Sequence, residues 1–100
     1  MPGLIVSVSH RLSQDEALRR IKAVVAHAKV QYSDKISDLH ESWNGYVGAV
    51  EASGMGQKGS GTVAVNPSDV TVHITLPFAA LLFKSRIESA IRDTLMRILA

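Results

Sequence analysis

The sequence predicts an α+β fold in which two amphipathic helices pack on one face of a curved antiparallel sheet, in the order β-α-β-β-β-β-α. Two observations predict this architecture. Apolar residues recur at helical spacing in two long segments, one near each end of the chain. Between these segments, apolar and polar residues alternate in short runs separated by turn residues, as in strands with one buried face. A chain of 100 residues can bury one such core, so we expect a single domain over residues 1–100.

The N-terminal third predicts one strand and one helix. Residues 4–8 form a short β-prone run of apolar residues, broken only by Ser7. The sequence from Ser13 to Glu16 then matches a capping box, in which the serine hydroxyl and the glutamate carboxylate each bond an unpaired backbone N–H. Glu16 and Arg20 are also spaced to form an ion pair on the helix surface. The helix is expected to end between residues 33 and 36, and its apolar stripe contains Leu18, Ile21, Val25, Ala28 and Tyr32.

The middle of the chain predicts four strands. Asn44-Gly45 is a strong hairpin signal, because both residue types tolerate the positive φ of a type I′ turn, so strands are expected over 39–43 and 46–52. Residues 53–61 include glycines at positions 54, 56, 59 and 61 and are predicted to form a flexible turn or loop. The remaining strands are predicted over 62–65 and 70–76.

A second amphipathic helix is predicted after Pro77, with a stripe that contains Phe83, Ile87, Ile91, Leu95 and Ile98. The longest apolar run, residues 76–83, is far shorter than the roughly 20 residues of a membrane-spanning helix, so no transmembrane segment is expected. The first eight residues lack the basic region of a signal peptide. The absence of cysteine excludes disulfides, thiolate metal sites and cysteine nucleophiles. We therefore expect a soluble, cytoplasmic protein.

Charge is distributed unevenly but weakly along the chain. Residues 13–35 carry five basic and three acidic side chains, residues 36–76 carry one and four, and residues 77–100 carry four and two. The two ends are thus mildly basic and the middle is mildly acidic. Nucleic-acid binding needs a concentrated basic face, so no nucleic-acid partner is expected.

A set of short motifs runs along the chain in a fixed order. They are His10-Arg11-Leu12, Trp43-Asn44-Gly45, Ser53-Gly54, Thr62 to Val65, Val70 to Leu76, and Ile87, Ile91 and Leu95 in the last helix. Together they resemble the family of polyhydroxyalkanoic acid system proteins, short bacterial proteins often encoded near genes for storage-polyester granules. The resemblance implies association with polyester granules or their metabolism, and it supplies no catalytic residue.

No catalytic, cofactor-binding or metal-binding residue is predicted. The four histidines, His10, His27, His40 and His73, lack the paired spacing of zinc motifs. No Gly-x-Ser-x-Gly elbow is present, and the glycine-rich segment lacks the ending of a phosphate-binding loop. His10 lies between the first strand and the first helix, where we expect it either to bond backbone groups locally or to contact a ligand.

Trp43 and Glu41 are the other candidate ligand contacts. Trp43 lies beside the predicted hairpin turn, as either a packing residue of the sheet or a stacking platform for a ligand. Leu39, Glu41 and Trp43 alternate along one strand and therefore share a face. Glu41 is consequently either half-buried or placed on a bulged strand.

The apolar segment that contains Phe78, Leu81, Leu82 and Phe83 is the candidate contact patch. The helical stripe is expected to bury Ala80 and Phe83, which leaves the other three large side chains in need of a partner. Three partners are considered: the first helix, a second copy of the protein in a homodimer, and the surface of a polyester granule.

These observations predict a non-enzymatic accessory protein of polyester granules or their metabolism, which binds through this apolar patch. The alternative is a small carrier that holds a lipid-like molecule in a pocket between the sheet and the last helix. In that alternative, Gly48 and Ala52 are small because they leave room for the ligand.

Overall fold

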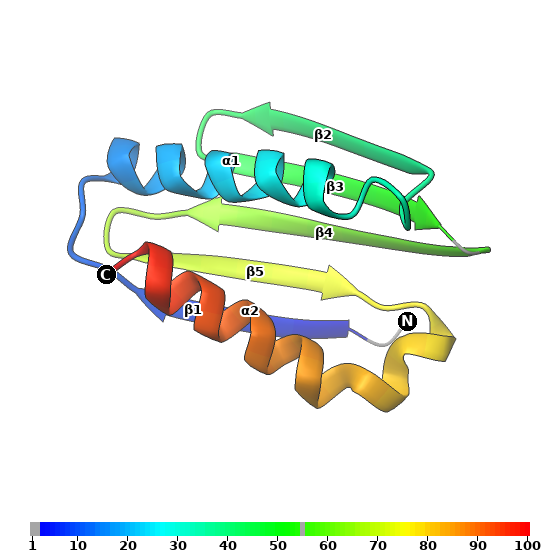
Figure 1. Ribbon diagram of the computed structural model, residues 1–100. Coiled ribbons are helices and arrows are strands. Elements are labelled where there is room, and N and C mark those ends of the chain that lie inside the picture. Colours follow the sequence, from blue (N-terminus) through cyan, green and yellow to red (C-terminus); the bar gives the residue numbers. More distant parts are fainter. Residues whose placement is uncertain (1–2, 55) are drawn as a thin grey trace.

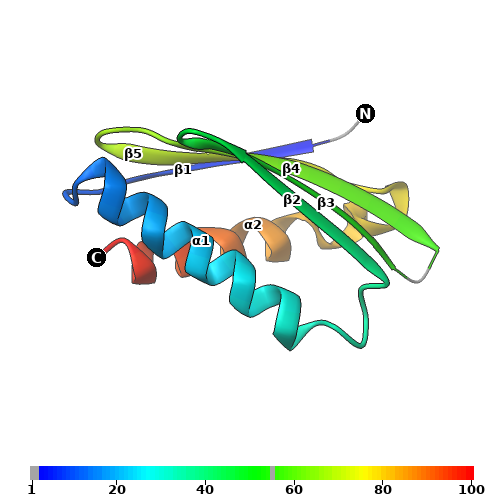
Figure 2. The same ribbon diagram turned by 90° about the horizontal axis from the view of Figure 1, so that it is seen from above.

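The computed structural model describes residues 3–54 and 56–100 and confirms the α+β fold. Five strands form one antiparallel sheet in the order β1-β5-β4-β3-β2. Both α-helices lie on the same face of this sheet, which is twisted (Figure 1, Figure 2). The elements are β1 (Gly3–Ser9), α1 (Gln14–Gln31), β2 (Asp38–Asn44), β3 (Val47–Gly54), β4 (Gln57–Val65), β5 (Asp69–Thr75), the 3₁₀ helix η1 (Phe78–Phe83) and α2 (Lys84–Ile98).

The strand register places the apolar side chains of the sheet on the face that carries the helices, here called the inner face. Val72 pairs with Val6 on one side and with Val63 on the other, so these three side chains lie in one row across the sheet. The buried core joins such strand residues to residues of α1 and the end of α2: Leu4, Val6, Ala17, Ile21, Val65, Val70, Val72, Leu76, Leu95 and Leu99. The outer face carries mainly serine, threonine and charged residues, which explains the alternating pattern of the sequence.

The glycine-rich segment 53–61 forms a hairpin, so of the predicted flexible turn or loop only a short turn is present and most of the segment is strand. β3 continues to Gly54, β4 begins at Gln57, and these two residues pair with each other. Gly56 has a φ of +76°, a conformation that favours glycine, so its glycine serves the tight turn. Met55, within the same predicted loop, lies outside the described residues.

Two glycines of that segment lie inside β4 rather than in the turn. A Cβ atom on Gly61 would lie 3.0 Å from the carbonyl oxygen of His73 on β5, so a larger residue there would press against the neighbouring strand. Gly59 has more space, since the nearest atoms to its Cβ position are 3.8 Å and 3.9 Å away. Glycine at these two positions leaves the first half of β4 without side chains on the inner face, whereas Val63 and Val65 occupy the second half.

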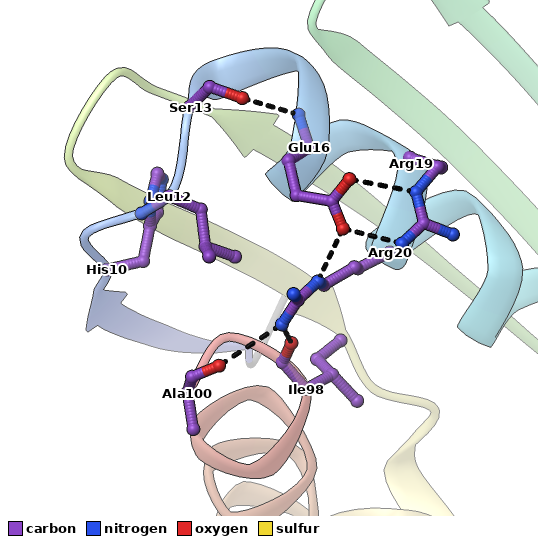
Figure 3. Close-up of polar contacts among 8 residues, drawn as sticks. All are labelled: His10, Leu12, Ser13, Glu16, Arg19, Arg20, Ile98 and Ala100. Carbon is purple, nitrogen blue, oxygen red and sulfur yellow. Dashed lines mark hydrogen bonds and ion pairs between the residues drawn. The ribbon is translucent and has the colours of Figure 1, made fainter.

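Ser13 caps α1 as predicted, but Glu16 does not complete the capping box. The Glu16 N–H donates to Ser13 Oγ at 3.1 Å. The Glu16 carboxylate instead accepts hydrogen bonds from Arg19 and Arg20, and the Nε atom of Arg20 lies 2.7 Å from Glu16 Oε2 (Figure 3). The predicted pair of Glu16 and Arg20 is confirmed. Bonds from two guanidinium groups are stronger than one from a backbone N–H, which explains the orientation of the carboxylate.

Arg20 also joins the two helices. Its Nη1 atom donates to the backbone oxygens of Ile98, at 2.8 Å, and Ala100, at 3.1 Å (Figure 3). Carbonyl groups at the end of a helix lack partners within the helix, and a cation beside them complements the helix dipole. The start of α1 and the end of α2 are therefore held together, and the two helices diverge from this end (Figure 1).

The start of α1 is attached to the same end of the sheet. Gln14 donates through Nε2 to the carbonyl oxygen of Val65, at the end of β4, at 2.8 Å. The Tyr46 hydroxyl, in the turn between β2 and β3, donates to the carboxylate of Asp15. These bonds and the Arg20 contacts define one end of the molecule, which we call the closed end.

The chain after Pro77 forms a 3₁₀ helix before it enters α2, which changes the predicted apolar stripe. Ile87, Ile91 and Ile98 are partly buried against the core as expected. Phe83 is 52% exposed, so the prediction that the stripe buries it was wrong. A 3₁₀ helix has three residues per turn rather than 3.6, and this shifts the residues of η1 relative to the stripe of α2.

The ion pairs at the closed end predict a stability that falls in acid. Hydrogen bonds from Arg19, and secondly from Arg20, lower the pKa of Glu16 from 4.5 to about 2. A lowered pKa stabilises the fold above the pKa of the unfolded chain, and this contribution is lost as the pH falls from about 4.5 to about 2. We expect Glu16→Gln to be less stable than the wild type at pH 7 in urea unfolding, and the difference to shrink across this window.

The matched control is Glu51→Gln, which removes an exposed carboxylate of β3. It should follow the wild-type curve more closely than Glu16→Gln does. A stability difference between Glu16→Gln and the wild type that stays constant from pH 7 to pH 2 would contradict the prediction.

Candidate functional site

Within residues 3–54 and 56–100, no group of three or more His, Asp or Glu side chains is arranged to hold a metal ion. His27, His40 and His73 are exposed and lie on different elements, α1, β2 and β5. No helix in the described part of the chain is long and apolar enough to cross a membrane. The candidate sites are therefore the sequence-predicted contacts His10, Trp43 and Glu41 and the apolar surfaces.

His10 is buried at the closed end, with both ring nitrogens bonded to backbone groups. Nδ1 accepts the Leu12 N–H at 3.1 Å, and Nε2 donates to the carbonyl oxygen of Asn66 at 3.0 Å. The backbone N–H can only donate and the carbonyl can only accept, so the partners define a neutral ring with its proton on Nε2. His10 thus joins the β1–α1 junction to the turn before β5, and these bonds leave no ring nitrogen for a ligand.

Glu41 and Trp43 lie together on the inner face of β2, opposite α1. The indole Nε1 of Trp43 donates to Glu41 Oε2 at 2.6 Å, and Lys29 Nζ from α1 lies 2.9 Å from Glu41 Oε1. The Glu41 side chain is only 15% exposed, so the prediction that it is half-buried is confirmed. β2 pairs with β3 in unbroken register, so the alternative of a bulged strand is wrong. The bonds from Trp43 and then Lys29 lower the pKa of Glu41, which keeps the carboxylate charged on an otherwise apolar face.

Trp43 is a packing residue of this cluster. Its ring is partly buried against the core, and Lys22 Nζ lies 5.3 Å from the ring centroid in a cation–π contact. The cluster of Lys22, Lys29, Glu41 and Trp43 therefore attaches α1 to the edge of the sheet, through one ion pair and one cation–π contact. The structure brings Glu41 and Trp43 together, as the shared strand face implies, and it places His10 in a separate environment at the closed end.

Gly48 is small because the indole ring covers it. A Cβ atom there would lie 2.8 Å from three ring atoms of Trp43, the residue that pairs with Gly48 across the hairpin. The alternative in which Gly48 leaves room for a ligand is therefore wrong for this position. Ala52, in contrast, lines open space.

An apolar groove of about 280 Å³ lies on the inner face beyond this cluster. The inner-face residues that line it are Val50, Ala52, Gly59, Gly61, Val63, Val72, Ile74 and Leu76, with Pro77 at one side. The groove is located where the two helices diverge, and no described residue of α2 lines it. This groove therefore lies apart from the position predicted for a ligand, between the sheet and the last helix.

The other apolar surface is η1, which follows directly after Pro77. Phe78 is 85% exposed, Leu82 is 90% exposed and Phe83 is about half exposed, whereas Leu81 is half-buried. These three exposed side chains are here called the η1 patch. Ala80 packs against the core and holds η1 in place. The sequence identified this segment because its apolar residues outnumber the positions that one helical stripe can bury.

The sequence interpretation identified Ala52 as a residue that leaves room for a ligand, but it missed the rest of the groove. Its floor depends on the pairing of Gly61 with Val50 on one side and Ile74 on the other, which places a residue without a side chain between two apolar neighbours. The glycines were the only available signal, and their number within nine residues is also typical of a loop.

The fold and these surfaces define a small α+β protein with an apolar groove and an exposed apolar segment. The chain belongs to the family described as "Putative polyhydroxyalkanoic acid system protein", whose model matches residues 4–99. The resemblance inferred from the sequence motifs is thus confirmed.

No curated protein matches the chain by sequence. Among solved structures, the chain is similar to the crystal structure of Ara h 8.0201, with 10% sequence identity and a TM-score of 0.46. The alignment covers 98% of this chain and 97% of that one.

The geometry of His10 predicts a structural role. The substitution His10→Ala leaves the Leu12 N–H and the Asn66 carbonyl without their side-chain partner. An unpaired buried polar group lowers the free energy of unfolding by about 1–3 kcal/mol. We expect urea unfolding to show a loss of about that size. His73→Ala, which removes an exposed histidine of β5, should change the stability far less. Equal losses in both variants would contradict this role.

Proposed function

We propose that this protein is a non-enzymatic, cytoplasmic accessory protein of the polyhydroxyalkanoate system, and that it binds an apolar surface of the storage granule through the η1 patch. The observation that carries the proposal is the exposure of Phe78 and Leu82 at 85% and 90%. Membership of the polyhydroxyalkanoic acid system family supports the choice of granule.

The exposure of the η1 patch argues against an internal partner for it. The first helix was one of the three partners considered from the sequence. In the structure, α1 does not cover Phe78 or Leu82. Large apolar side chains that protrude together are typical of contact surfaces, whereas single ones are ordinary on any protein. Ala80 packs against the core beneath them, so the patch is presented on an element attached to the sheet.

A polyester surface fits the chemistry of the patch. Polyester chains offer alkyl groups and carbonyl acceptors and no hydrogen-bond donors, so they suit side chains that bring neither charge nor polar groups. Burial of one Leu or Phe side chain contributes about 1.5–3 kcal/mol, so two such residues suffice for measurable partitioning.

The first test is partitioning of the purified protein onto polyhydroxybutyrate particles in a sedimentation assay. We expect Phe78→Ser/Leu82→Ser to bind at least tenfold more weakly than the wild type, a ratio that corresponds to about 1.4 kcal/mol of lost apolar burial. Both residues are exposed in the free protein, so the thermal unfolding midpoint should change little.

The matched control is Val30→Ser/Met96→Ser, which removes two exposed apolar side chains from α1 and α2. It should retain binding. Equal binding by the η1 variant and the wild type would refute the proposal. If the η1 variant instead converts a dimer to a monomer in ultracentrifugation without changing the binding, the patch is a homodimer interface.

The second candidate function is that of a small carrier for a lipid-like molecule, now located in the groove. The lining of the groove favours it, because the inner-face side chains that surround it are all apolar. Such a lining suits an alkyl chain and offers no side-chain donor to fix a polar ligand.

This candidate predicts that a side chain built into the groove blocks binding. Gly59→Leu fills open space, since the atoms nearest to a Cβ there lie at 3.8 Å and 3.9 Å. We expect decanoate to bind about tenfold more weakly in calorimetry, because displacing two methylene groups costs about 0.8 kcal/mol each. Ala49→Leu, with the same side chain on the outer face of β3, is the control and should bind as the wild type does. No binding of decanoate by the wild type would exclude this carrier function for alkanoates.

A further inference from the structure

The charges of the protein are separated between its two layers. α1 carries four basic and two acidic side chains, and α2 carries the same numbers, so the helices together have a net charge of +4. The five strands carry one basic and four acidic side chains, a net charge of −3. Both helices lie on one face of the sheet, so the helix side is positive (Figure 2). Glu41 faces α1, and the outer face of the sheet carries Asp38, Glu51, Asp69 and Lys58, a net charge of −2.

The basic side chains continue directly from the η1 patch. Lys84 and Arg86 are exposed in the first turn of α2, and neither forms an ion pair with any residue that the structure describes. No acidic residue occurs between Asp69 and Glu88 in the sequence. The segment 78–86 therefore combines exposed large apolar side chains with two basic ones and has no negative charge.

We propose that the segment 78–86 binds an anionic phospholipid surface, with Phe78 and Leu82 in the acyl region and Lys84 and Arg86 at the headgroups. Aromatic and leucine side chains beside lysine and arginine are the combination that interfacial lipid-binding segments use. This inference rests on the proposed function for the role of the η1 patch, and it names the chemistry of the surface that the patch meets.

Charge complementarity favours an anionic lipid surface over a polyester surface or a second copy of the protein as the partner of segment 78–86. A neutral polyester fits the apolar side chains of the η1 patch alone, because it offers no counter-charge to Lys84 and Arg86. A second copy in a twofold dimer contributes the same patch, and its Lys84 and Arg86 then add like charges at the interface. An anionic lipid layer satisfies both parts of the segment, and the net charge of +4 on the helix side orients the protein toward it.

The test is co-sedimentation with sucrose-loaded vesicles, either of phosphatidylcholine alone or of an equal mixture with phosphatidylglycerol. We expect binding to the mixed vesicles and much weaker binding to phosphatidylcholine. Lys84→Gln/Arg86→Gln should weaken binding to mixed vesicles about fivefold for each charge removed. Phe78→Ser/Leu82→Ser should weaken it by about tenfold or more. Salt should weaken the wild-type binding through screening.

The matched control is Lys35→Gln/Lys58→Gln, which lowers the net charge by the same two units at exposed positions outside the segment. Retained binding by this control and loss by Lys84→Gln/Arg86→Gln would support a local contact. Equal loss in both variants, or no binding of the wild type to mixed vesicles, would overturn the inference. In the latter case, binding to bare polyester particles would leave the proposed function standing, and its absence would remove both.

Discussion

The contacts of Arg20 set the geometry on which both apolar surfaces depend. One guanidinium group holds the Glu16 carboxylate and the backbone oxygens at the end of α2, so the two helices meet at the closed end of the sheet. His10 fixes the junction between β1 and α1 at this same end. From this attachment the helices diverge, and no helical residue that the structure describes lines the groove on the inner face.

The uncovered end of the inner face is compatible with folding because of the residues that occupy it. Gly59, Gly61 and Ala52 present little apolar surface to water, so leaving them uncovered costs less than exposing larger side chains would. Glu41, on the same face, stays charged through the bonds from Trp43 and Lys29, which satisfy a carboxylate that burial alone would disfavour. The sheet thus has a packed half under the helices and an open half in which Ala52, Gly59 and Gly61 lie among larger apolar residues.

The sequence predicted the elements whose signals are local. Asn44-Gly45 specifies its own turn, and the alternation over Val70 to Leu76 reports one buried face, so the fold class and the element order followed from the pattern. It failed where the outcome depends on pairing between distant segments. Whether Gly59 and Gly61 belong to a loop or to β4 is decided by the register with β3 and β5, and the exposure of Phe83 follows from a 3₁₀ geometry that no motif marks.

The two apolar surfaces adjoin at Pro77, which lines the groove and precedes η1, and their dimensions suggest which contact dominates. Ligand pockets usually enclose about 300–1,000 Å³, and the groove, at about 280 Å³, lies just below this range and is open along the sheet. The η1 patch instead projects whole side chains, and insertion of Phe78 and Leu82 would remove nearly all of their exposed area from water. Because the gain from burial scales with that area, we expect attachment to an extended surface through η1 to be the stronger of the two proposed contacts.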